Sequence, residues 1–189
     1  TVIVSGLADG LDSEGHRAAV EAGTPTVAFL GTAIDTTYPA ANLKLRRRIE
    51  KDGGAVCSEY PPGYQGKQKG TFLARNRLIA GLSEVLCVAE ARIRSGTLNT
   101  VSHAERLGRP VLAVPGSIYS PQSQGTNELL RTGRAGVLSK ASDVLDCMGV
   151  AVEAAAPQQS AFAPEETSPD AQAVYAALGP MPKGVDELA

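Results

Sequence analysis

The stretch formed by residues 69–91, KGTFLARNRLIAGLSEVLCVAEA, limits what this chain can fold into more than any other part of it. Its apolar residues first recur at spacings of three and four, as one face of a helix requires, and then form a continuous run over residues 85–89. Parallel sheets bury such continuous runs on both faces. We therefore expect a helix that leads into a buried parallel strand, and the buried face of the helix would carry Phe72, Leu73, Leu78, Ile79 and Leu82.

The start of this expected helix is basic. Lys69, Arg75 and Arg77 bring three positive charges within nine residues, with no acidic residue among them. A helix N-terminus already favours anions, so added cations cost a little stability there and point to a functional reason. The ring of Phe72 lies in the same segment and can stack on a flat group. The segment therefore predicts a binding site for a polyanion.

Strand-like and helix-like segments alternate along the chain, which favours an α/β fold with a Rossmann-like, doubly wound and mostly parallel sheet. We expect the strands near residues 1–5, 26–30, 55–59, 85–89, 109–116 and 136–138. We expect the helices near residues 12–23, 42–49, 72–82, 98–107 and 125–132, with Asn42 as the cap of the second helix.

Composition excludes several classes of protein. A hydrophobic content of 43% with 20% charged residues is typical of a soluble globular protein, and no apolar run is long enough to span a bilayer. The three cysteines are widely spaced, and Cys57 and Cys87 fall in apolar strand patterns, as expected for buried, reduced thiols in the cytoplasm. No pair of residues has the spacing of zinc ligands, so we expect neither a metal nor a cofactor.

Charge divides the chain into two parts. Residues 1–150 contain 17 basic and 14 acidic residues, a net charge of +3, whereas residues 151–189 contain 1 basic and 6 acidic residues, a net charge of -5. A weakly positive domain can bind nucleic acid when its charge is clustered. Residues 151–168 are rich in Ala, Pro, Gln and Glu without periodicity, which indicates a linker.

Two turns that contain glycine are further candidate sites. Each turn precedes an expected helix, where free backbone amides can cradle a phosphate. The alternative is that the glycines only permit a tight turn and the hydroxyls only cap the helix. The local sequence favours this alternative for the first turn, which has no G-x-G-x-x-G pattern, and leaves both open for the second. The residues concerned are Ser5, Gly6 and Gly10 in the first turn and Ser95, Gly96 and Thr97 in the second.

The segment K-x-x-F-x-x-R-N-R-x-I-A-G-L-S, which begins at Lys69, resembles the DNA-processing protein A (Smf) family. Further segments resemble the same family: SGLADGLDSEGH, the pattern G-x-x-x-D-x-x-Y-P from Gly31 to Pro39, SEYPPG and the Ser-Gly-Thr turn. Asp9 departs from the family pattern, in which an Arg is common, and this weakens the prediction of anion binding at that position.

The resemblance implies a single-stranded DNA-binding protein without enzymatic activity. Its expected role is in natural transformation, where it would protect incoming DNA and load the recombinase RecA, as a cytoplasmic homodimer. Lys69, Arg75 and Arg77 would then neutralise phosphates, Phe72 would stack on a base, and Asn76 would bond to the DNA backbone or fix the loop. Residues 5, 6, 10 and 95–97 would receive further phosphates.

The resemblance covers residues 1 to about 150 and, more weakly, residues 169–189, which resemble the opening of the family's winged-helix domain. It implies a fragment that lacks a preceding strand-turn-helix unit with a Gly-Ser-Arg phosphate loop. The strand at residues 1–5 would then be an apolar edge without its neighbour, and such edges promote aggregation. We expect, on this basis, that residues 1–189 are not a self-sufficient domain.

Two other classes of protein remain open. The first is a nucleotide-processing enzyme of the lysine-decarboxylase-like phosphoribohydrolase type, which carries P-G-G-x-G-T-x-x-E at a helix start. This chain reads SGTLNT there, with one glycine and no glutamate, which weakens that interpretation. The second is a protein-interaction module, which would leave the basic segment around Phe72 unexplained.

Overall fold

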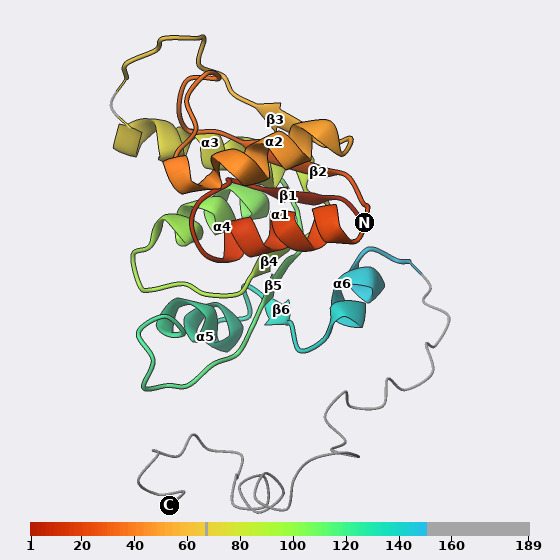
Figure 1. Ribbon diagram of the computed structural model, residues 1–189. Coiled ribbons are helices and arrows are strands. Elements are labelled where there is room, and N and C mark those ends of the chain that lie inside the picture. Colours follow the sequence, from red (N-terminus) through yellow and green to blue (C-terminus); the bar gives the residue numbers. More distant parts are fainter. Residues whose placement is uncertain (67, 151–189) are drawn as a thin grey trace, which may run out of the picture. The chain divides into compact units, whose positions relative to one another are not determined.

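The computed structural model describes residues 1–66 and 68–150, and for residues 68 and 69 it describes the backbone only. The expected linker and the expected start of a winged-helix domain lie outside the described residues. Strands and helices alternate along the described chain, which confirms the α/β class (Figure 1). The elements are β1 (Ile3–Ser5), α1 (Leu11–Glu21), β2 (Thr26–Phe29), η1 (Ala40–Asn42), α2 (Leu43–Lys51), β3 (Ala55–Cys57), α3 (Gln68–Leu82), β4 (Leu86–Val88), α4 (Gly96–Arg106), β5 (Val111–Ala113), α5 (Gln124–Arg131), β6 (Gly136–Val137) and α6 (Ala141–Cys147).

The strands form two parallel sheets of three strands each, ordered β1-β2-β3 and β4-β5-β6. In the first sheet Val4 lies opposite Val27 and Val27 opposite Ala55, and in the second Cys87 lies opposite Leu112. Within residues 1–66 and 68–150, β1 and β4 are not paired with each other. The single continuous sheet that alternation favours is therefore present as two halves. The expectation that the chain is not self-sufficient stays a prediction.

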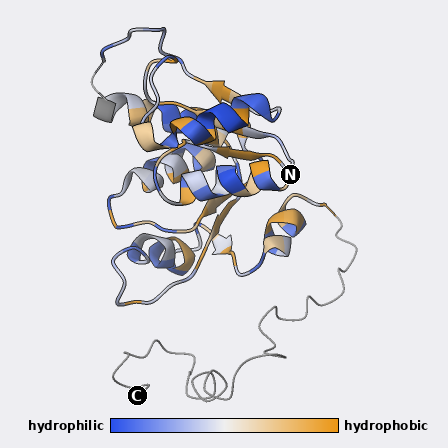
Figure 2. Ribbon diagram, viewed as in Figure 1, coloured by the Kyte–Doolittle hydropathy of each residue, from blue (hydrophilic) through white to orange (hydrophobic). Residues whose placement is uncertain are grey.

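The first sheet is packed against α1 and α2, which lie in front of it in Figure 1. Its core joins Leu7 at the end of β1, Ala28 and Leu30 around β2, and Leu45 and Ile49 on α2. The two residues from α2 are four apart, so they share the helix face that Figure 2 shows as an orange stripe on a largely blue helix.

The second sheet is packed against α4 and α5, and α3 packs against α4. Ala80 of α3, Val101 and Ala104 of α4 and Leu129 of α5 meet the strand residues Leu86, Val88, Val111 and Ala113 in one apolar cluster. Helix α3 also contacts β1 and β2. It therefore joins the two sheets, and the residues it carries are placed relative to both.

The burial of the central stretch differs from the expectation in two respects. Strand β4 buries Leu86 and Val88 but exposes Cys87, because alternate residues of a strand face opposite sides and only one side is packed against α3 and α4. On α3, Ile79 is buried, whereas Leu73 and Leu82 are 39% and 52% exposed. The expected burial of Cys87, Leu73 and Leu82 is wrong.

Helix α6 was not among the expected elements. Its seven residues show no clear apolar period, but its start is marked by Asp143, whose carboxylate accepts hydrogen bonds from the backbone N–H groups of Ser139 (2.7 Å) and Lys140 (2.9 Å). These bonds hold the pKa of Asp143 below its ordinary value. An acidic residue three positions after the cap is therefore the local signal for this helix.

Candidate nucleic-acid interface

The carboxyl ends of the parallel strands place their loops on one edge of the molecule, on the left in Figure 1. Open parallel sheets bind ligands at this edge. The loop after β2 continues the pairing of β2 and β3, because Leu30 N donates to Cys57 O (2.8 Å) and Ile34 N donates to Tyr60 O (3.0 Å). The loops at this edge are therefore fixed by backbone hydrogen bonds.

The rings of Phe72 and Tyr38 form an aromatic pair on this edge. Their centroids are 5.4 Å apart and the rings are tilted by 47°. Phe72 packs over the backbone at Gly31, where a Cβ atom would collide with its ring, so the loop must have a glycine there. Tyr38 is 51% exposed and Phe72 is half-buried. The sequence pointed to Phe72 as the stacking ring, and the structure adds Tyr38 as the more accessible of the two.

A polar pocket of about 180 Å³ adjoins this pair. It is lined by the loop after β2, including Gly31 and Thr36, by Tyr64 and Gly66 of the loop before α3, and by Thr71 of α3. Tyr64 itself stacks on Tyr60, with centroids 4.7 Å apart. The pocket therefore reaches Gly31, over which Phe72 packs, and it is large enough for a small polar group such as a phosphate.

Arg75 lies beneath the aromatic pair instead of on the surface. Its side chain is only 6% exposed; it donates to Gly6 O (2.9 Å) and to Phe29 O, and its guanidinium carbon lies 5.8 Å from the centroid of Phe72. Burial lowers the pKa of Arg75 from its ordinary value, and the nearby carboxylate of Asp12 partly offsets this effect. Arg75 therefore ties α3 to the ends of β1 and β2, and in this conformation it does not reach an external phosphate.

The turn after β1 does not offer the free amides that phosphate binding requires. The Asp12 carboxylate accepts hydrogen bonds from Ser5 Oγ (2.7 Å), Gly6 N (3.1 Å) and Ala8 N (3.3 Å). Gly10 adopts a positive φ of 84° just before α1. A carboxylate of the chain occupies the position that a phosphate would take. The structure thus gives Ser5, Gly6 and Gly10 internal roles, and their contact with DNA stays a prediction without structural support.

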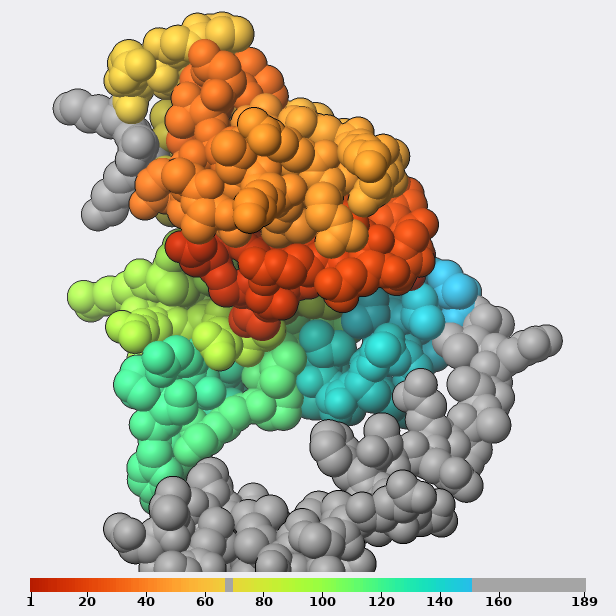
Figure 3. Space-filling model, viewed as in Figure 1, coloured from red at the N-terminus to blue at the C-terminus, as the bar shows by residue number. Residues whose placement is uncertain are grey.

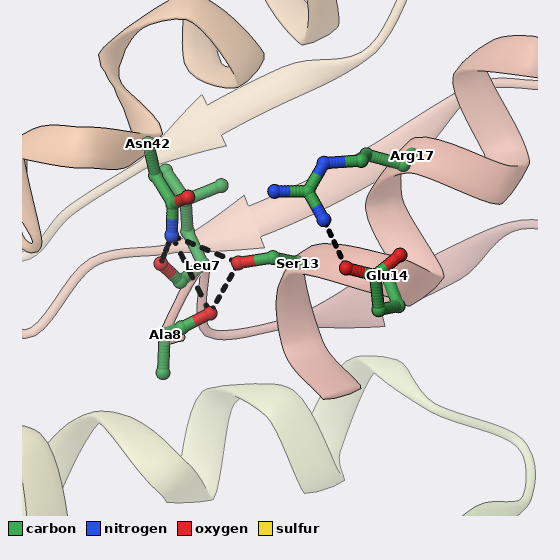
Figure 4. Close-up of polar contacts among 6 residues, drawn as sticks. All are labelled: Leu7, Ala8, Ser13, Glu14, Arg17 and Asn42. Atoms are coloured by element: carbon green, nitrogen blue, oxygen red, sulfur yellow. Dashed lines mark hydrogen bonds and ion pairs between the residues drawn. The ribbon is translucent and has the colours of Figure 1, made fainter. Parts of the chain in front are cut away.

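Asn42 holds the same turn from the other side (Figure 4). Its side-chain amide donates to Leu7 O (3.0 Å), Ala8 O (3.4 Å) and Ser13 Oγ (2.8 Å). The sequence suggested that Asn42 caps α2, and this expectation is wrong, because its side chain makes no bond to the first turn of that helix. The side chain instead serves the carbonyls at Leu7, whose φ is 56°, and Ala8, since buried carbonyls require a donor. Figure 4 also shows the surface ion pair of Arg17 with Glu14 on α1.

The N-terminus of α4 differs from this turn, because its amides have no side-chain cap. Ser95 occupies the cap position, but its hydroxyl makes no cap bond and is buried without a hydrogen-bond partner. Asn76 of α3 donates to Gly96 O (3.3 Å) and to Asn99 Oδ1 (3.4 Å) and so fixes this turn to α3. The N–H groups of Gly96 and Thr97 therefore lie in a favourable position for an anion.

The exposed cations near the site differ in their partners. Arg77 is half-exposed and pairs with Glu59 in the loop after β3, and an exposed pair of this kind is worth at most about 1 kcal/mol. Arg92 and Arg94, before α4, are exposed and have no ion-pair partner among residues 1–66 and 68–150. Lys69 lies in the first turn of α3, and its side chain is outside the described residues.

The described residues contain no group of three or more His, Cys, Asp or Glu side chains that could hold a metal ion. None of the described helices is both long and apolar enough to cross a membrane. What the edge does contain is a pair of rings, a helix N-terminus with free amides, and exposed arginines. This set can bind phosphates and a flat ring at the same time.

Fold and edge together define a parallel α/β protein that has an aromatic pair, exposed arginines and an uncapped helix N-terminus at the carboxyl ends of its strands. The family model of DNA recombination-mediator protein A matches residues 1–149. The chain therefore belongs to this family, as the motif around Phe72 indicated.

Two curated relatives and two solved structures agree with this assignment. The chain is 47% identical over 144 residues to DNA processing protein DprA of Streptococcus pneumoniae (76% of this chain and 50% of that protein). It is 39% identical over 189 residues to the putative DprA of Mycobacterium tuberculosis (99% of this chain and 48% of that protein). It thus spans about half the length of these relatives.

The crystal structure of Streptococcus pneumoniae DprA superposes with a TM-score of 0.70 at 45% identity, covering 77% of this chain and 50% of that one. A structure of DNA processing protein A from Helicobacter pylori, described for its single-stranded DNA binding mode, gives a TM-score of 0.68 at 31% identity, covering 78% and 65%.

Proposed function

We propose that this chain binds single-stranded DNA along the carboxyl edge of its strands, as part of DNA uptake in natural transformation. The observation that carries the proposal is the Tyr38–Phe72 pair, which lies on the same edge as the uncapped N-terminus of α4. One ring and one set of free amides match the two repeating parts of a single strand, its bases and its phosphates. Asn76 supports this role by fixing the α4 turn to the helix that carries Phe72.

The aromatic pair also predicts a preference for single strands. A base must be unstacked to lie on a ring, and the bases of a duplex are already stacked. Stacking is tolerant of sequence because every base has a flat face, which suits a protein that accepts any incoming strand. We further propose, from family membership, that the protein has no enzymatic activity, acts in the cytoplasm as a homodimer, protects the strand and loads RecA.

Fluorescence anisotropy with a labelled oligothymidine tests this proposal, with unlabelled single strand and duplex of equal length as competitors. We expect the single strand to compete at much lower concentration than the duplex. Equal competition by both would contradict the proposal. Incubation with nucleoside monophosphates tests the enzymatic alternative, and release of free base would overturn the non-enzymatic assignment.

A further inference from the structure

The loop between β5 and α5 presents two large apolar side chains to solvent. Tyr119 is 89% exposed and Ile118 is 74% exposed, more than any other large hydrophobic residue of the described chain. The loop follows the carboxyl end of β5, so it lies on the same edge as the proposed DNA site (Figure 1). Nothing in the proposed site described above uses these two side chains.

This exposed tip is held in place by hydrogen bonds at its base. The Asn127 side chain accepts from Gly116 N (3.1 Å) and donates to Gly116 O (2.9 Å). Within the tip, Ser120 N donates to Ser117 O (3.0 Å) and Ser123 N donates to Ser120 O (3.0 Å). Because the backbone of the loop is ordered in advance, a ligand that binds Tyr119 has to order only its side chain.

The tip is anchored to the basic loop that precedes α4. Ala91 N donates to Gln122 O (2.8 Å), and Gly125 N donates to Ala91 O (2.7 Å). In Figure 3 the two segments, coloured lime and green to teal, lie side by side on the left of the molecule. The exposed Arg92 and Arg94 directly follow Ala91. Tyr119 is thus on a loop that adjoins two unpaired cations.

The tip and the loop before α4 contain no negative charge of their own, although Glu90 and Glu128 directly flank the two segments. Residues 91–104 and residues 114–127 include no Asp or Glu. A surface with an exposed ring and two arginines without an ion-pair partner complements a polyanion that carries flat groups. An acidic or apolar protein surface would account for the arginines or for Ile118, but not for an exposed ring on a loop that adjoins two arginines.

We propose that Tyr119 is a second base-stacking platform for single-stranded DNA, with Arg92 and Arg94 as its phosphate contacts. This inference rests on the proposed function. A strand that starts at Tyr38 and Phe72 passes the N-terminus of α4 and reaches Tyr119 on the same edge. The site therefore has two stacking positions, the Tyr38–Phe72 pair and Tyr119. Only oligonucleotides long enough to reach both positions occupy Tyr119.

Titrations of the full chain with labelled oligothymidines of increasing length test this proposal. Tyr119→Ala should bind short oligothymidines as the unchanged protein does and lose about 5- to 100-fold in affinity for long ones. Tyr119→Phe, which keeps the ring, should bind like the unchanged protein at every length. Ile118→Ser is the matched control, because it removes an exposed apolar side chain that has no ring, and it should leave affinity unchanged.

Equal affinity of Tyr119→Ala and the unchanged protein at every length would overturn the second stacking position and leave the proposed function intact. An equal loss of affinity in Tyr119→Ala at all lengths would also overturn it. So would a loss of affinity in Ile118→Ser as large as that in Tyr119→Ala. Sedimentation without DNA gives a separate check: a change of oligomeric state in Tyr119→Ala would make the tip a protein interface. If the unchanged protein binds no oligothymidine at all, the proposed function itself fails.

Discussion

Arg75 has a structural role that its sequence context does not reveal. A charged group buried without partners would cost several kcal/mol, and here two backbone carbonyls and the face of Phe72 surround the guanidinium. The carbonyls belong to Gly6 and Phe29, at the ends of two neighbouring strands. The cation therefore fixes the position of Phe72 above the sheet, and the surface charge available for phosphates comes from other residues.

Replacing Phe72 by alanine separates stacking from core packing. If the ring or its pair with Tyr38 stacks on a base, Phe72→Ala should weaken single-strand binding by roughly 1–3 kcal/mol. The ring is half-buried over Gly31, so the melting temperature should also fall. Anisotropy titrations and thermal melts on the same preparation measure both effects.

Tyr38→Ala is the matched control for this pair. Tyr38 is 51% exposed and should contribute less to the core, so this variant should lose affinity with a smaller change in melting temperature. Unchanged binding per folded molecule in both variants would show that the rings serve only to pack the loop.

His16 should make stability depend on pH. Thr26 Oγ1 donates to Ile3 O, so it accepts from His16 Nδ1 (2.7 Å), and Nε2 is buried without a partner. Burial lowers the pKa of His16 below its ordinary value, although the carboxylate of Asp12 acts in the opposite direction. Below about pH 6.5 the unfolded chain therefore binds more protons than the folded chain, and the free energy of unfolding falls as the pH falls.

Urea titrations at about pH 7.5 and about pH 5.5 measure this decline, and His16→Gln should reduce it. His103→Gln is the matched control. The pKa of His103 is also lowered, by partial burial and by Arg106 and Arg77, so His103 contributes to the decline in the free energy of unfolding with the same sign. We expect the larger share from His16, because its side chain is fully buried. An unchanged decline in His16→Gln would contradict the assignment.

At the scale of elements, the N-terminus of α4 has no side-chain cap, because the hydroxyl of Ser95 makes no hydrogen bond to the first amides. The carboxylate of Asp143 on α6 bonds instead to the N–H groups of Ser139 and Lys140, which precede that helix. An uncapped N-terminus is less stable by about 0.5–2 kcal/mol than one with a good cap. The free amides of Gly96 and Thr97 are therefore consistent with a site that an anion completes.

Ser95→Asp gives opposite effects on stability and on binding. An aspartate at the cap position should accept hydrogen bonds from the first turn of α4 and raise the free energy of unfolding by about 0.5–1 kcal/mol. The same carboxylate would occupy the amides and repel a phosphate, so affinity for an oligothymidine should fall. Chemical denaturation and anisotropy titration measure the two effects.

Ser95→Ala serves as the control, because it removes a hydroxyl that has no partner in the free protein and should change stability little. If Ser95→Asp binds DNA as tightly as the unchanged protein, the α4 N-terminus is only the start of a helix.

The sequence predicted the positions of strands and helices better than it predicted the hydrogen bonds of their side chains. Apolar spacing and alternation located each strand and most helices, and the K-x-x-F segment located α3 and its aromatic residue. The burial of Arg75 was not predictable, because the carbonyl of Gly6, which accepts a hydrogen bond from its guanidinium, lies 69 positions away in the chain. The hydrogen bond from the Gly6 amide to Asp12 was also not predictable, because a glycine-rich turn has the same sequence pattern whether its amides bind a phosphate or a carboxylate of the chain.

At the scale of the whole molecule, the two sheets contribute to one edge. Helix α3 contacts β1 and β2 and packs against α4, so the aromatic pair above the first sheet and the uncapped N-terminus of α4 are fixed relative to each other. The net charge of residues 1–150 is only +3. Binding of a polyanion must therefore depend on where the cations lie, not on the total charge.

The salt dependence of oligothymidine binding tests the central claim most directly. Each phosphate contact should contribute about -0.7 to the slope of log affinity against log salt concentration, so an edge with several cations predicts a steep negative slope. Lys69→Ala should make the slope shallower by about 0.7 and leave the preference for single strands unchanged. A slope close to zero in the unchanged protein would contradict the account, because phosphates would then not be what this edge binds.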